Sequence, residues 1–112
     1  MTDQEKKYLA DIREAIRKIE FFIRDTSTFE VYVQDIETQS AVERQLSIIG
    51  EAVNRFTRLG APHTLESARQ IAGFRNRLIH AYGSMDNTIV WAILKRHIPS
   101  LKEEAVKKLA TK

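Results

Sequence analysis

The chain has 112 residues, of which 43% are hydrophobic and 29% charged, a size and balance typical of one globular domain with one core. The absence of cysteine excludes disulfide scaffolds, thiolate zinc sites and cysteine nucleophiles. The polar first residues are unlike a signal peptide, and no apolar run approaches the roughly 20 residues that span a bilayer, so we expect a cytoplasmic protein without a membrane segment. The net charge of +3 permits nucleic-acid binding without arguing strongly for it.

Residues 2–23 are predicted to form a long amphipathic helix. Apolar residues recur there at spacings of three and four, which places them on one helical face: Leu9, Ile12, Ile16, Ile19 and Ile23. Thr2 and Glu5 have the spacing of a capping box. The polar run Asp25–Thr28 ends this helix. A short helix is expected around Phe29–Val33, although its β-branched residues leave its type open.

A second long helix is predicted from a further apolar stripe: Val42, Leu46, Ile49, Val53 and Phe56. Gly60 suits a left-handed cap at its end, and Pro62 cannot continue it. A third long helix is expected from Thr64, a plausible N-cap, towards Gly83.

The last predicted helical region begins at Asp86, which is suited to an N-cap, and its stripe comprises Ile89, Val90, Ile93, Leu94, Leu101, Ala105 and Leu109. Pro99 predicts a kink or a restart within it. Short connections between long helices indicate antiparallel neighbours. We therefore predict an all-α, up-and-down antiparallel bundle of four to five helices in a single domain, residues 1–112.

The segment Gly73–Gly83 places a charge on an apolar face. At about 100° per residue, four apolar or aromatic residues lie within about 60° of Arg75: Ile71, Leu78, Ile79 and Tyr82. A permanent charge in that position needs a carboxylate, a phosphate or a partner chain. Two structural explanations remain open, since Glu51 on the preceding helix is available to pair with Arg75, and His80 near a helix end favours the helix dipole.

Arg75 and His80 are about 140° apart on an ideal helix, which is too far for one compact site. The helix must therefore distort near His80, or two chains must share the site. Asn76 precedes His80 by four residues and lies on the same face.

The pattern Arg75-x4-His80-x-Tyr82, together with Asn76, resembles the signature of HEPN domains of the HepT type, which are prokaryotic toxins paired with small nucleotidyltransferase antitoxins. The similarity covers most of the chain and includes Ile48–Ala52, Leu78–Tyr82, Ile89–Trp91 and Ile98–Leu101. One departure is Ala68-Arg69-Gln70, where relatives often carry a tryptophan, and it bears on packing rather than on the catalytic pair.

The resemblance implies a metal-independent endoribonuclease that acts on RNA as a homodimer, with a common cleft. His80 has the intrinsic pKa to move protons near neutral pH, and Arg75 can hold the phosphate with its planar fork. Asn76 would orient the imidazole or the sugar, and Glu51 would hold Arg75. Tyr82 resembles the acceptor of AMP units that the nucleotidyltransferase antitoxin transfers.

No cofactor or metal is expected, because the histidines are scattered without carboxylates at ligand spacing and the glycines are isolated. One alternative is a non-catalytic nucleotide- or substrate-binding subunit of a nucleotidyltransferase complex. His80 favours the nuclease, since binding alone would not require it. A purely structural helical dimer explains the stripes but not the charge at Arg75.

Overall fold

A computed structural model of the chain describes residues 1–60, 65, 67 and 86–110. This part of the chain contains helices and no strands, which confirms the predicted all-α class. The elements are α1 (Asp3–Phe22), α2 (Phe29–Val33), α3 (Ile36–Arg58), α5 (Asn87–Ala92), the π-helical turn η1 (Ile93–His97) and α6 (Ile98–Ala110). The helix expected between Thr64 and Gly83 lies outside the described residues. Among the described helices, none has the length and apolar character needed to cross a bilayer.

The predicted capping box is present at the start of α1. The backbone N–H of Glu5 donates to Thr2 Oγ1 at 3.1 Å, and the Thr2 N–H donates to Glu5 Oε1 at 3.2 Å. At the end of α3, Gly60 has a φ of 68°, the left-handed conformation that was expected there. The start of α1 and the end of α3 are therefore determined by residues at the helix ends themselves, which can be read from the sequence.

The short segment Phe29–Val33, whose type the sequence left open, is helical. Thr28 begins it, because its hydroxyl accepts the Val31 N–H at 3.2 Å. At its other end, the Gln39 side-chain amide donates to the carbonyls of Tyr32 and Val33 at 2.9 and 3.0 Å. These contacts supply partners for backbone groups that a helix of five residues leaves free.

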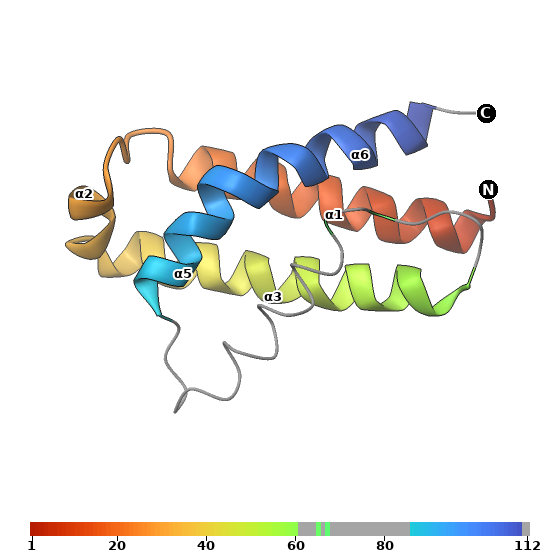
Figure 1. Cartoon of the computed structure of the whole chain (residues 1–112), viewed down its shortest axis with the longest axis horizontal. Helices are drawn as coiled ribbons and strands as arrows, with labels where there is room; N and C mark the ends of the chain where they lie inside the picture. Colours follow the sequence, from red (N-terminus) through yellow and green to blue (C-terminus); the bar gives the residue numbers. More distant parts are fainter. Residues whose placement is uncertain (61–64, 66, 68–85, 111–112) are drawn as a thin grey trace.

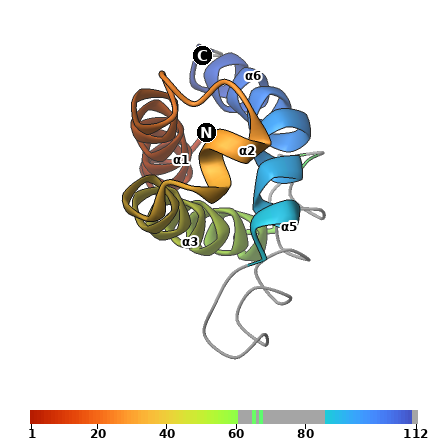
Figure 2. The same ribbon diagram turned by 90° about the vertical axis from the view of Figure 1, so that its left-hand side faces the viewer.

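The long helices pack as an antiparallel bundle (Figure 1). α1 runs against both α3 and α6, and the view along the bundle shows α2 across its end (Figure 2). The predicted stripes meet in one core, whose fully buried residues include Leu9, Ile12, Val42, Ile49, Val90, Leu101 and Ala105. A surface ion pair, Lys102 Nζ to Glu20 Oε2 at 2.9 Å, joins α6 to the outside of α1.

The helical path through Pro99 is continuous, because a wide turn precedes the proline. Pro99 has no N–H, and in a regular helix its ring would clash with the carbonyl four residues earlier. Here the preceding turn is π-helical, and the Ile98 N–H donates to the carbonyl of Ile93, five residues back. The predicted kink or restart thus takes the form of η1, after which α6 begins at Ile98.

Candidate functional site

The predicted site is described at one of its five residues. Glu51 lies on α3, whereas Arg75, Asn76, His80 and Tyr82 lie outside the described residues. The catalytic pair and the modification site therefore stay predictions, and the described part of the chain gives the surroundings of Glu51.

The segment Ile48–Ala52 divides between the core and the surface. Ile49 is fully buried and Ala52 is nearly so, and both belong to the core between α1 and α3. Ile48 is 37% exposed, and Glu51, three residues later on the same face, is also exposed. The segment thus anchors α3 on one side and offers a carboxylate beside an apolar side chain on the other.

Glu51 forms an ion pair within its own helix. Arg55 Nη2 lies 2.6 Å from Glu51 Oε1, and about half of each side chain is exposed. Sequence reasoning missed Arg55 as a partner, although the four-residue spacing on a helix could have identified it. Because an exposed pair of this kind contributes little stability, the carboxylate of Glu51 can exchange partners at small cost. The predicted contact with Arg75 would therefore compete with Arg55.

A shallow groove of about 190 Å³ runs between α1 and α3 at this point. Its described lining consists of two ion pairs, Lys7–Asp11 and Arg55–Glu51, with apolar and aromatic side chains between them: Tyr8, Ile48 and Ala52. Since each cation in this lining has a carboxylate on its own helix, the groove is close to neutral. The described lining of the groove contains no histidine.

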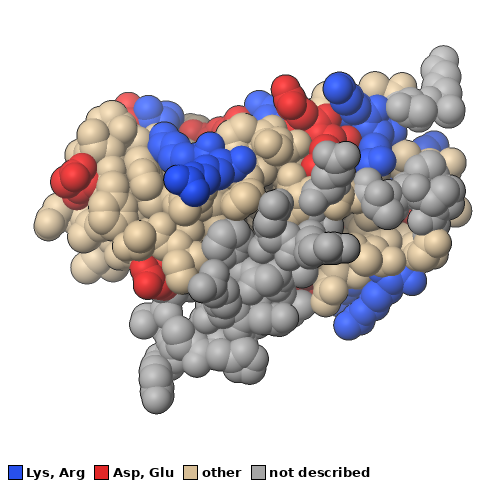
Figure 3. Space-filling view, viewed as in Figure 1, with Lys and Arg blue, Asp and Glu red and all other residues tan. Residues whose placement is uncertain are grey.

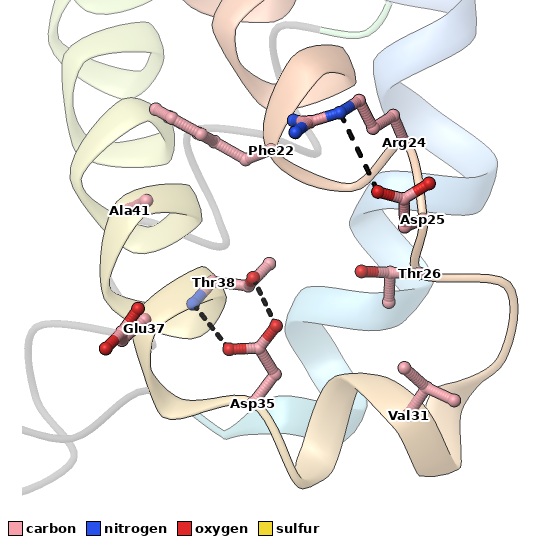
Figure 4. A pocket seen from close by; sticks show the side chains of 9 residues that line it. All are labelled: Phe22, Arg24, Asp25, Thr26, Val31, Asp35, Glu37, Thr38 and Ala41. Carbon is pink, nitrogen blue, oxygen red and sulfur yellow. Dashed lines mark hydrogen bonds and ion pairs between the residues drawn. The ribbon is translucent and has the colours of Figure 1, made fainter.

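A larger hollow of about 420 Å³ lies at the end of the bundle, where the turns around α2 meet the start of α3 (Figure 4). Asp35 caps α3 there and accepts hydrogen bonds from the Thr38 N–H at 3.1 Å and the Thr38 hydroxyl at 2.6 Å. These bonds to Thr38 hold the pKa of Asp35 below its usual value. Arg24 faces Asp25 at 3.7 Å in the same view. The charged groups of this hollow serve caps and turns, and the described lining includes none of the predicted site residues.

Comparison with known proteins identifies the class to which this bundle belongs. The family model described as "Ribonuclease HepT-like" matches residues 12–107. A protein of Thermococcus cleftensis named "Probable ribonuclease HepT" is 45% identical over 106 residues, which cover 91% of this chain and 93% of its own length. No solved structure matches the chain significantly.

Two further relatives carry the name "Putative RNase". One, from Caldanaerobacter subterraneus subsp. tengcongensis, is 34% identical over 100 residues, or 87% of this chain and 88% of its own length. Another, from Methanocaldococcus jannaschii, is 34% identical over 102 residues, or 88% of this chain and 82% of its own length. The chain belongs to the HepT-like ribonuclease family. This result confirms the resemblance to HepT-type proteins that was predicted from the sequence motifs.

Proposed function

We propose that this protein is an endoribonuclease that cleaves RNA without a metal ion, through attack of the neighbouring 2′-hydroxyl on the phosphate. The observation that carries the proposal is the family match over residues 12–107, a span that contains Glu51 and the whole run from Arg75 to Tyr82. Relatives named as ribonucleases align over most of the chain, which supports the same activity.

In the proposed reaction His80 takes the proton of the 2′-hydroxyl as the new bond from the 2′-oxygen to phosphorus forms. The bond from phosphorus to the 5′-oxygen breaks, and the leaving oxygen takes up a proton from an imidazolium or from water. Arg75 holds the phosphate and stabilises the charge that develops on it. Asn76 orients the imidazole or the sugar. Glu51, which exchanges between Arg55 and Arg75, positions the latter guanidinium.

The proposal includes a homodimer and a protein that regulates it. In a dimer, Arg75 and His80 of both chains would face a common cleft. This arrangement would bring the two residue types together although they point in widely different directions on one ideal helix. A small nucleotidyltransferase would act as antitoxin by transferring AMP to Tyr82, forming a bond from the phenolic oxygen to phosphorus and releasing pyrophosphate from ATP. The added phosphodiester would place an anion near Arg75, where it competes with RNA.

The catalytic assignment is tested by cleavage of a single-stranded RNA in EDTA. His80→Ala and Arg75→Ala should each abolish cleavage while the helical circular-dichroism signal is retained, since general acid–base catalysis contributes about 100- to 10,000-fold. His63→Ala, which removes a histidine outside the predicted run, is the matched control and should cleave normally. Cleavage by His80→Ala at the wild-type rate would contradict the assignment.

The regulatory assignment is tested by intact mass measurement after co-expression with a nucleotidyltransferase partner. Wild-type protein should gain mass in AMP-sized steps, and Tyr82→Phe should gain none. Tyr8→Phe removes a half-buried tyrosine of α1 and should still be modified. Modification of Tyr82→Phe would exclude this acceptor.

The dimer has a separate test in light scattering of the purified protein. A mass of two chains at micromolar concentration is expected, and a monomer would contradict the shared cleft.

A further inference from the structure

Basic side chains gather on the face of the molecule where the chain passes from α5 into α6 (Figure 3). The π-helical turn η1 between these helices carries three consecutive basic residues, Lys95, Arg96 and His97. Lys95 and Arg96 are exposed, while Ile93 and Leu94 of the same turn are buried in the core. The turn is therefore anchored from within and presents cations outward.

These two cations differ from those lysines and arginines of the described part of the chain that are held in ion pairs. Lys7, Arg55 and Lys102 each lie within 2.9 Å of a carboxylate oxygen. Neither Lys95 nor Arg96 forms an ion pair with a carboxylate in the described residues. Their positive charge is consequently available to an external anion.

An aromatic platform lies directly beneath Lys95. The Nζ atom of Lys95 is 4.7 Å from the centroid of the ring of Trp91, which lies one helical turn earlier. The Trp91 ring packs against Tyr32 at 5.6 Å and Phe29 at 6.2 Å, both from α2. Tyr32 is fully buried, so Trp91 is supported by the core while remaining partly exposed itself.

We propose that Lys95, Arg96 and the Trp91 ring bind the substrate RNA outside the catalytic pair, with the two cations on backbone phosphates and the ring against a base. This inference rests on the proposed ribonuclease function. When Lys95 turns to a phosphate, it uncovers the face of Trp91, and a base can stack there without sequence preference. An acidic protein surface would satisfy the cations with carboxylates but has no nucleobase to stack on the ring face. Single-stranded RNA uses both.

Turn geometry gives a second reason for this choice. π-Helical turns occur frequently at functional sites. Here the turn places Lys95 and Arg96 next to each other on the surface while the path into α6 remains helical. Two neighbouring cations on an anchored backbone can bind more than one phosphate of a nucleic-acid strand.

The test measures RNA binding separately from cleavage. A fluorescein-labelled, unstructured RNA is titrated by anisotropy with the full-length chain carrying His80→Ala, so that no cleavage intervenes. Loss of two phosphate contacts lowers the slope of log affinity against log salt by about 1.4, at about 0.7 per contact for single strands. In that background, Lys95→Ala/Arg96→Ala should therefore bind about 25-fold more weakly at roughly 0.1 M salt.

The matched control is Arg13→Ala/Lys18→Ala, which removes the same charge from exposed positions on α1. It should retain nearly the full affinity and salt slope. If the Lys95/Arg96 variant binds like this control, the inference is wrong, whether or not the wild type cleaves RNA. A loss of binding only to a protein partner would overturn it as well, by assigning the surface to that partner.

The role of the ring is tested with Trp91→Leu and two ligands, the RNA and a strand of equal length without bases. The variant should lose affinity for the RNA and not for the abasic strand, because only the RNA has bases to stack. Equal losses for both strands would contradict stacking. If wild-type protein fails to cleave RNA in EDTA while these binding differences hold, the proposed reaction is wrong and the binding surface stands.

Discussion

Replacing Tyr32 with phenylalanine should stabilise the protein. Tyr32 is fully buried, and within the part of the chain that the structure covers its hydroxyl has no hydrogen-bond partner. An unpaired buried polar group costs about 1–3 kcal/mol, so Tyr32→Phe should raise the free energy of unfolding by up to that amount. At about 2.1 cal/mol/K of unfolding entropy per residue, each kcal/mol corresponds to about 4 °C in Tm for a chain of 112 residues.

The same substitution should change the alkaline limb of the stability curve. Burial, with a smaller contribution from Glu43, raises the pKa of Tyr32. In the unfolded chain the phenol ionises near pH 10, whereas the folded chain keeps the proton. The free energy of unfolding therefore falls as pH rises beyond about 10, and Tyr32→Phe lacks this part of the fall.

Urea unfolding at about pH 7 and about pH 11 measures both effects. Tyr8→Phe is the matched control, because the Tyr8 hydroxyl is at the surface and accepts a hydrogen bond from Gln4 Nε2 at 3.3 Å. Its stability should change by less than about 0.5 kcal/mol. A Tyr32→Phe protein that is less stable than wild type by about 1 kcal/mol would show that the buried hydroxyl is satisfied, and would refute the reasoning.

Three further substitutions test local features of the fold. Thr2→Ala removes the capping box of α1 and should lower the free energy of unfolding by about 1 kcal/mol in urea titration; an unchanged value would show that the cap contributes nothing. Ile12→Ala empties a fully buried core position and should cost about 2–5 kcal/mol in the same assay, so a smaller loss would indicate local collapse. Because Thr38 lowers the pKa of Asp35, that carboxylate stabilises the fold above about pH 4 and loses this effect as pH falls, so Asp35→Asn should flatten the acid limb of thermal unfolding; an identical limb would contradict this.

Much of the fold follows from patterns that act over a few residues. The stripes of α1 and α3 are buried because a spacing of three and four fixes one face of a helix, and any stable packing must cover it. The Thr2 cap and the left-handed conformation of Gly60 could also be predicted from the sequence, since both depend on the residue and its immediate neighbours.

Contacts between distant segments could not be predicted in the same way. Periodicity places Val90 and Ile93 on the buried face of the last helical region, but it does not show that Trp91 of α5 meets Tyr32 of α2. The wide turn before Pro99 is a similar case, because the sequence predicts a disturbed helix and several geometries relieve the clash. At the candidate site, Glu51 was predicted because its segment resembles a family motif. Its ion pair with Arg55 was missed, although the spacing of four residues on a helix is enough to predict it.

The short helix α2 owes its existence to segments on either side of it. Five residues cannot sustain a helix in water, and this one depends on the Gln39 amide from α3 and on the Trp91 ring from α5. The amide hydrogens of α2 should therefore be no better protected from exchange than those of α5, because opening of α5 removes support from the unit that the two helices form. A nascent chain would assemble that unit only after α5 has been synthesised. The aromatic support beneath Lys95 thus belongs to the completed protein, and a partly made chain does not present it to RNA.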